Sequence, residues 1–202
     1  MKEELKRIRE YLMTGVSYMI PIVVIGGVFI AVAIALSGVE AGTGANVTNP
    51  FLNSLMDIGG AAFSMMVPIL AGYIAYGIAD RPGLAPGLVG GVLANNIKAG
   101  FLGGIIAGLI AGYVARWIKG WKVNKNLRPI MPIFVIPLIS SFIVGILMLY
   151  VLGNPIASLM ASMTAGLKNM STGNSVVLAL IMGAMIAFDM GGPVNKVAFM
   201  FG

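Results

Sequence analysis

Long apolar runs without charge alternate with shorter polar segments along the 202 residues of the chain. A membrane-spanning helix needs about 20 apolar residues, so each long run predicts one crossing. The runs are continuous and do not alternate residue by residue, which favours helices over the strands of a β-barrel. They extend from Gly15 to Leu36, Ile58 to Ala79, Ala99 to Ala115 and Pro129 to Leu152, and a further run begins at Ser175 and continues to Phe188.

The segment from Pro82 to Ile97 is shorter and contains Pro86, yet the distribution of charge favours a crossing here too. If this segment crosses, 10 of the 13 basic residues lie on one side of the membrane. They are the four of the N-terminal segment, Arg81 and the five of residues 116–128. The positive-inside rule assigns that side to the cytoplasm. We therefore predict a short or broken third span, and about six transmembrane helices in an all-α integral membrane protein.

The polar segments between the spans predict loops and interfacial helices. Met1 to Met13 is amphipathic and predicts an interfacial helix on the cytoplasmic side. Ser37 to Asp57 has two acids and no base, which predicts an extracytoplasmic loop, whereas the basic segment Arg116 to Arg128 predicts a cytoplasmic one. Asn154 to Lys168 predicts a second amphipathic helix, because its first residues can cap a helix and its apolar residues recur on one face.

The composition supports a membrane protein and excludes several kinds of chemistry. The chain is 58% hydrophobic and 10% charged, with a mean hydropathy of +0.96, whereas soluble domains carry about 25% charged residues. The absence of Cys and His excludes disulfides, thiol nucleophiles and phosphocysteine or phosphohistidine carriers on this chain, and we expect no metal and no cofactor. The net charge of +6 fits a cytoplasmic face and anionic lipid rather than nucleic acid, since Trp117 and Trp121 lie among the cations as interfacial anchors do.

Glycines at regular intervals predict close packing between helices. Gly104, Gly108 and Gly112 form two overlapping GxxxG steps in the fourth span, and small residues at this spacing let helix backbones approach each other. The alternative is that a glycine-rich span produces such spacing by chance. In the third segment, glycines at positions 83, 87 and 91 and the asparagine at 95 recur every four residues, so they would share one helical face.

The most distinctive polar cluster is the stretch FDMGGPVNK, which follows the last apolar run. An Asp or Lys at the centre of a lipid-exposed helix costs about 2.5–3.5 kcal/mol, so this placement indicates a polar site within the membrane. Asp189 can accept hydrogen bonds, Asn195 can donate and accept, and Lys196 can donate, while Gly191 and Gly192 let the backbone approach a ligand beside the proline break. Alternatively, Asp189 pairs with Lys196 or caps a helix end.

Asp80 and Arg81 form a second charged pair, placed between the second apolar run and a Pro-Gly sequence. They fit a structural turn at a cytoplasmic helix end. The functional alternative is a hinge or a contact with a cytoplasmic partner. The chain shows no paired acids, nucleophile–base arrangement or Walker-type loop, so we do not expect it to catalyse a reaction alone.

Five strings stand out when the chain is taken as a whole: LMTGVSYMIP (12–21), AGYIA (71–75), IADRPGLAPG (78–87), GFLGGIIAG (100–108) and AFDMGGPVNK (187–196). In order and spacing they resemble the fructose-type enzyme IIC of the bacterial phosphoenolpyruvate-dependent sugar phosphotransferase system. The resemblance covers nearly the whole chain, and ADRPG and FDMGGPVNK are its specific strings.

The resemblance implies a homodimeric, multi-pass sugar permease of the bacterial cytoplasmic (inner) membrane, with its N-terminus in the cytoplasm. Residues 1–168 would supply the dimerisation scaffold, and residues 169–202 would begin a transport domain that moves fructose or a related hexose or hexitol by an elevator-like motion. The polar residues of FDMGGPVNK would line the sugar site. Asp80 and Arg81 would form a hinge or contact the IIB domain.

The resemblance also implies phosphoryl-carrier partners. A separate IIB domain would phosphorylate the sugar from a phosphocysteine, which receives its phosphoryl group from a phosphohistidine on IIA. Whether this chain counts as an enzyme is therefore left open. The chain stops at Gly202, before the acidic Thr-Glu-Gly segment of the family's sugar site, so we expect a truncated transport domain. The alternatives outside the family are an unrelated secondary transporter or a structural membrane subunit.

Overall fold

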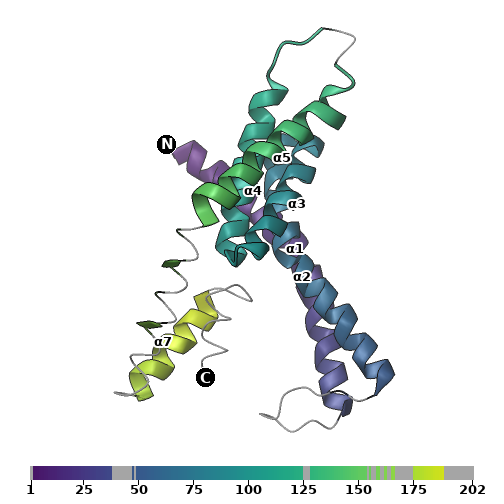
Figure 1. Ribbon diagram of the computed structural model, residues 1–202, viewed down its shortest axis with the longest axis vertical. Helices are drawn as coiled ribbons and strands as arrows, with labels where there is room; N and C mark the ends of the chain where they lie inside the picture. Colours follow the sequence, from purple (N-terminus) through teal and green to yellow (C-terminus); the bar gives the residue numbers. More distant parts are fainter. Residues whose placement is uncertain are drawn as a thin grey trace.

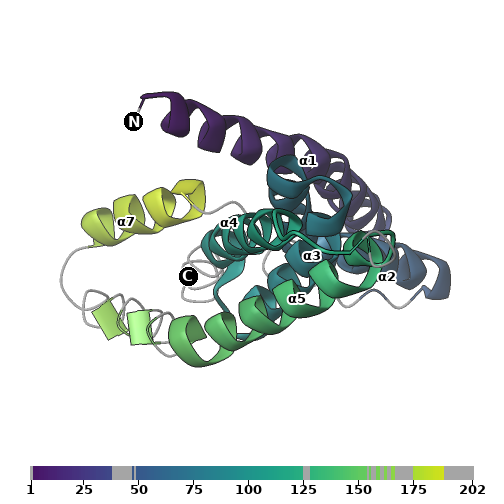
Figure 2. The same ribbon diagram turned by 90° about the horizontal axis from the view of Figure 1, so that it is seen from above.

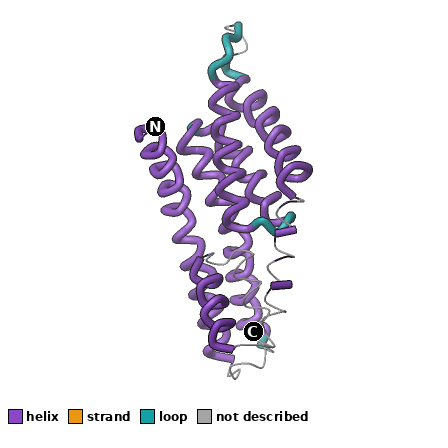
Figure 3. Tube along the Cα trace, turned by 90° about the vertical axis from the view of Figure 1, so that its left-hand side faces the viewer, coloured by secondary structure: helices purple, strands orange, loops and turns teal. Residues whose placement is uncertain are grey.

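The computed structural model describes residues 2–37, 47, 49–124, 128–153 and 175–188, with residues 155, 158, 159, 162, 165 and 166 between the last two ranges. Every regular element in this part of the chain is helical (Figure 3). In chain order the elements are α1 (Lys2–Ser37), α2 (Pro50–Ala79), α3 (Arg81–Asn96), α4 (Gly100–Lys119), η1 (Met131–Val135), α5 (Ile136–Ile146), η2 (Leu147–Leu152) and α7 (Ser175–Phe188) (Figure 1). The elements η1 and η2 are π-helical turns at the two ends of α5.

Four helical stretches among the described residues are long and apolar enough to cross a membrane: Glu3–Ser37, Pro50–Ala79, Gly100–Lys119 and Met131–Leu152. The prediction of an all-α membrane protein is confirmed. With 16 residues, α3 is about 24 Å long and shorter than the ~30 Å hydrocarbon core of a bilayer, so its crossing stays a prediction. The same holds for α7, which has 14 residues.

The central helix is α2. The helices α1, α3 and α4 each pack against it, and α5 packs against α3 and α4 (Figure 2). Four residues on successive turns of α2 are fully buried: Leu70, Ala71, Ile74 and Ala75. Small side chains of α4 and larger ones of the α5 region complete this core, namely Ala107, Ala111, Val144 and Met148.

The pair α1–α2 is a long antiparallel hairpin that extends beyond the group of shorter helices (Figure 1). Gly15 of α1 lies against Ile74, and Ile30 lies against Gly59, so the residue numbers rise along one helix as they fall along the other. Apolar side chains on the distal part of this hairpin are exposed: Val24, Ile25, Val28, Phe51 and Ile58. Exposure of this kind fits a surface that faces lipid or another protein.

The helices α3 and α4 form a second hairpin on α2. Near the far end of α3, the Asn95 side-chain amide donates a hydrogen bond to the Ser64 carbonyl at 3.2 Å, well along α2. The last turn of α4 then returns to the start of α3, where Lys119 contacts Asp80. The first turns of α1, the end of α2 and the end of α4 therefore meet at one end of the molecule, which gathers segments that the sequence assigns to the cytoplasm.

The predicted loop from Ser37 to Asp57 is wrong in its second half, because α2 begins at Pro50. The side-chain oxygen of Asn49 accepts hydrogen bonds from the backbone N–H groups of Phe51 at 2.9 Å and Leu52 at 3.5 Å. Proline suits the first helical position because a backbone N–H there would have no acceptor within the helix. Its ring also fixes φ near the helical value. The Asn-Pro pair therefore starts the helix eight residues before the apolar run.

Two further boundaries differ from the sequence-based prediction. The segment Met1–Met13 was expected to form a separate interfacial helix, but α1 continues through it without a break, since no Gly or Pro interrupts the helix between Lys2 and Thr14. The fourth span does not end at Ala115, because α4 continues to Lys119 and places Arg116 and Lys119 in its last turn. Cations are favourable at that end of a helix dipole. Most of the predicted amphipathic helix 154–168 lies outside the described residues.

The fifth span contains Pro132 and Pro137 and yet runs helically from Met131 to Leu152. Its first turn is a π-turn, in which the N–H of Ile136 reaches the carbonyl of Met131. A proline removes one donor and crowds the carbonyl four residues earlier. The wider π-turn directly before Pro137 accommodates that ring without ending the helix.

Candidate functional site

The predicted sugar-site motif lies outside the described residues. Its members Asp189, Gly191, Gly192, Asn195 and Lys196 follow directly after α7, which ends at Phe188. Their role in sugar binding, and the alternative in which Asp189 pairs with Lys196 or caps a helix, both stay predictions. The boundary between a scaffold of residues 1–168 and a transport domain of residues 169–202 stays a prediction for the same reason.

The second predicted pair, Asp80 and Arg81, forms the corner between α2 and α3. Asp80 alone separates the two helices, and its backbone has φ 62° and ψ −151°, a region that only glycine adopts readily. The corner is hydrogen-bonded on both sides: the Asp80 N–H donates to the Tyr76 carbonyl at 2.8 Å, and the Gly83 N–H donates to the Asp80 carbonyl at 3.0 Å. Arg81 begins α3 with its side chain exposed.

An ion pair joins this corner to the end of α4. The ammonium of Lys119 lies 2.7 Å from a carboxylate oxygen of Asp80, with 49% of the Lys119 side chain and 74% of the Asp80 side chain exposed. Because both groups are well solvated, the pair contributes at most about 1 kcal/mol. The pair marks where the ends of α2 and α4 come together.

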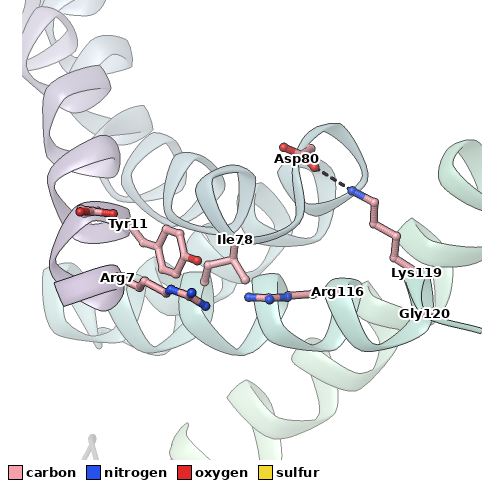
Figure 4. A pocket seen from close by; sticks show the side chains of 8 residues that line it. Arg7, Tyr11, Ile78, Asp80, Arg116, Lys119 and Gly120 are labelled. Atoms are coloured by element: carbon pink, nitrogen blue, oxygen red, sulfur yellow. Dashed lines mark hydrogen bonds and ion pairs between the residues drawn. The ribbon is translucent and has the colours of Figure 1, made fainter. Parts of the chain in front are cut away.

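An open cleft of about 580 Å³ lies beside this ion pair and was not foreseen from the sequence. Its lining comes from α1, α2, the corner residue after α2, α4 and the residue after α4: Arg7, Glu10, Tyr11, Ile78, Asp80, Arg116, Lys119 and Gly120. Figure 4 shows the guanidinium groups of Arg7 and Arg116 pointing toward each other beside Tyr11 and Ile78. Residues this distant in sequence meet only through the packing of α1 and α4 on α2. The one sequence signal for the cleft was that basic residues recur in segments assigned to the same side of the membrane.

The three glycines of the predicted packing face lie against α2. A Cβ added at Gly104 would lie 2.6 Å from a side-chain carbon of Val67, and one added at Gly112 would lie 2.6 Å from Ile78. At Gly108 the nearest atom belongs to the backbone, since the Ala71 carbonyl oxygen would be 2.7 Å away. A side chain at any of the three positions would require a neighbour to shift, and at Gly108 that neighbour is the α2 backbone, so α4 lies in close contact with α2.

The glycines of α3 approach the same helix. A Cβ at Gly87 would also lie 2.7 Å from the Ala71 carbonyl oxygen, and a Cβ at Gly91 would lie 2.5 Å from the Cα of Pro68. One carbonyl of α2 thus faces a glycine of α3 and a glycine of α4. The three helices meet at Ala71 without side chains between their backbones.

Among the described residues, no group of three or more acidic side chains lies close enough to hold a metal ion. The arrangement offers helix contacts, one strained corner and one cationic cleft.

The family model described as phosphotransferase system, EIIC, matches residues 13–202. The chain belongs to this family. The chain is 50% identical over 197 residues to the "Fructose-like permease IIC component 2" of Escherichia coli (strain K12), covering 98% of this chain and 55% of that protein. It is 54% identical over 203 residues to the "PTS system fructose-specific EIIB'BC component" of the same organism, covering 100% of this chain and 35% of that protein.

A relative from Vibrio cholerae serotype O1 with the same description is 54% identical over 202 residues, which are 99% of this chain and 34% of the relative. The chain thus spans about half or less of the length of the curated relatives it matches. No solved structure matches the chain significantly. The sequence-based assignment to enzyme IIC, and with it to a helical membrane protein, is confirmed.

Proposed function

We propose that this EIIC chain works in a sugar permease of the phosphotransferase system and moves fructose or a related hexose or hexitol across the membrane. The observation that carries the proposal is the family match over residues 13–202, together with relatives of 50% and 54% identity whose descriptions name a fructose-like permease and a fructose-specific component. The alternatives of an unrelated secondary transporter or a structural subunit have no comparable support.

The sugar contacts of this proposal come from the motif after α7. Sugar hydroxyls both donate and accept hydrogen bonds, and Asp189, Asn195 and Lys196 together supply acceptors and donors for them. The Gly191–Gly192 pair lets backbone amides approach the ring, and a proline break is the kind of backbone that lines cavities at membrane depth. The family match extends through all of these residues.

The proposed partners are IIB and IIA phosphocarrier domains and a second copy of the chain. A IIB domain is supported by the EIIB'BC descriptions of the relatives. A homodimer is supported by the exposed apolar side chains of the distal α1–α2 hairpin, among them Val28 and Phe51. Because Arg7 and Arg116 lie at the same end of the bundle, we place that end and the N-terminus at the cytoplasmic side of the bacterial inner membrane.

The proposal is tested by uptake of radiolabelled fructose in cells whose only fructose permease carries this chain, with IIA and IIB supplied. We expect uptake that requires phosphoenolpyruvate and delivers the sugar in phosphorylated form. Asp189→Asn should reduce it by about tenfold or more, because a charged hydrogen bond to the sugar is lost. Asp57→Asn makes the same chemical change at an exposed position of α2 and should leave uptake nearly unchanged.

The outcomes separate the function from its site. Absence of phosphoenolpyruvate-dependent uptake by the unmodified chain would contradict the permease function. Normal uptake by Asp189→Asn would remove only Asp189 from the sugar site. Arg81→Ala tests the partner contact: if it blocks sugar phosphorylation and leaves sugar binding intact, the α2–α3 corner contacts IIB, and if both are unchanged, the corner is a structural turn.

A further inference from the structure

The residues that line the cationic cleft at the end of the bundle are not among those of the proposed sugar site. The cleft is formed between α1 and α4, both of which pack on α2, and Ile78 of α2 contributes an apolar wall. The guanidinium groups of Arg7 and Arg116 come from opposite sides of the cleft and point toward each other (Figure 4). Tyr11 lies beside them with a hydroxyl that can donate a hydrogen bond.

The charges of the cleft are unevenly compensated. Asp80 is occupied by Lys119 at 2.7 Å. Among the residues that the structure describes, the one acidic partner of Arg7 is Glu4 at the long distance of 3.9 Å, and Glu4 lies outside the cleft. Arg116 forms no ion pair within the described part of the chain. The remaining carboxylate of the lining, Glu10, opposes two arginines, so the open part of the cleft carries a net positive charge.

Two converging guanidinium groups are chemically suited to one anionic group with several oxygens. A phosphate oxygen pair accepts two parallel N–H donors from a single arginine, and a phosphate between two arginines relieves their mutual repulsion. Arginine, with its planar pair of donors, is the usual side chain for recognising phosphate groups. The shared chemistry is therefore that of a phosphate ester or a free phosphate.

The surroundings of the cleft favour a lipid phosphate over a soluble one. Trp117 and Trp121 lie next to the α4 cations, with their rings in an edge-to-face contact at 5.1 Å, and 62% of Trp117 is exposed. Tryptophans of this kind mark the headgroup level of a bilayer. Exposed apolar side chains also continue from there along one face of α4, at Tyr113 and Ile106.

We propose that the cleft between α1 and α4 binds the phosphodiester headgroup of an anionic phospholipid, with Arg7 and Arg116 as the phosphate ligands and Tyr11 as a further donor. The acyl chains lie along the exposed apolar face of α4. The bound headgroup joins the first turns of α1 to the last turn of α4, two segments that both pack on α2. This site does not depend on the proposed sugar function.

The test is lipid binding to the chain in detergent micelles, measured by native mass spectrometry with added phosphatidylglycerol or phosphatidylcholine. Micelles of neutral detergent remove the surface potential of a bilayer, so binding reports the site itself. We expect the chain to bind phosphatidylglycerol, and Arg7→Gln and Arg116→Gln each to weaken it by about tenfold. The double variant should be little weaker than either single variant, because one phosphate bridges both side chains.

The matched control is Lys122→Gln, which removes one exposed cation just past α4 that does not line the cleft. It should change the affinity less than twofold. Arg7→Lys and Arg116→Lys keep the charge and lose the planar fork, and they should fall between the original chain and the Gln variants. Because both arginines are exposed, all variants should keep the helical circular dichroism and elution volume of the original chain.

Four results would each overturn the proposal. Equal binding of phosphatidylcholine would show that the negative headgroup is not recognised. Displacement of the lipid by inorganic phosphate would assign the cleft to a soluble anion. An effect of Lys122→Gln as large as that of Arg116→Gln would show diffuse attraction without a site. Normal lipid binding by the arginine variants, combined with lost phosphoryl transfer from IIB, would assign the cleft to a protein partner.

Discussion

Replacing Gly108 with alanine tests the backbone contact between α4 and α2. The added Cβ would lie 2.7 Å from the Ala71 carbonyl oxygen and 3.0 Å from both the Ala71 Cα and the Ile74 Cβ. Ordinary contact begins at 3.4 Å, so α4 must move away by about 0.7 Å. The obstructing oxygen belongs to a buried helix backbone and cannot rotate aside. Overpacking of this kind costs about 1–3 kcal/mol.

The same substitution at Gly60 provides the control, because an added Cβ there meets nothing within 4 Å. Both changes raise helix propensity by about 1 kcal/mol. Gly60→Ala should therefore be neutral or stabilising, whereas Gly108→Ala should be less stable than Gly60→Ala by about 1–3 kcal/mol, which is the overpacking cost alone. The difference between the two variants cancels the propensity term.

The assay is unfolding in mixed micelles with increasing sodium dodecyl sulfate, followed by helical circular dichroism. Circular dichroism is suitable because the chain has no cysteine that a thiol-reactive dye could label on unfolding. Gly108→Ala should unfold at a lower detergent fraction than Gly60→Ala, and at the same fraction as the original chain or a lower one, whereas Gly60→Ala should unfold at the same fraction as the original chain or a higher one. If the two variants shift equally, α4 does not approach α2 as closely as described, and the glycine spacing is a product of composition alone.

Substitutions at three further positions test single features with the same unfolding assay. Asp80→Gly should be more stable than Asp80→Ala by about 1–3 kcal/mol, since both lose the ion pair with Lys119 and only glycine accepts the backbone conformation; equal midpoints would contradict a strained corner. Asn49→Ala should cost about 1 kcal/mol through loss of the α2 cap, while Asn49→Ser should retain most of the stability. Ser140→Ala should be neutral or stabilising by up to about 2 kcal/mol, because the fully buried Ser140 hydroxyl has no hydrogen-bond partner among the described residues. A clear loss of stability would show that the hydroxyl does have a hydrogen-bond partner.

The helices could be predicted because the apolar runs are long and the glycine intervals match the helical period. Boundaries failed where a local signal outweighed hydropathy. At Asn49–Pro50 a cap and a proline start α2 within a segment that composition alone assigns to a loop. Hydropathy indicates which residues lie in the bilayer, whereas capping hydrogen bonds decide where a helix begins. A helix can therefore begin with polar turns that lie outside the bilayer.

The cleft between Arg7 and Arg116 could not be predicted from the sequence for a different reason. Periodicity orders residues within one helix, but it does not fix which helix is the neighbour or how far two helices are offset. That offset comes from the backbone contacts at Gly15 on one side of α2 and Gly112 on the other. For the predicted sugar-site motif the situation is reversed. Its residues were identified from the sequence alone, and they lie outside the described residues.

The strained corner at Asp80 follows from the same glycine contacts. Because Gly83 places α3 within backbone contact of Ala75, the chain must reverse direction between α2 and α3 in one residue. A single residue can do this only in a region of φ and ψ that is costly for aspartate. The contacts at Gly87 and Gly91 hold α3 against α2, and the exposed ion pair to Lys119 adds a weak contact between the corner and α4. These contacts hold α3 and α4 close to α2 around the strained corner, and the hinge expected at Asp80 stays a prediction.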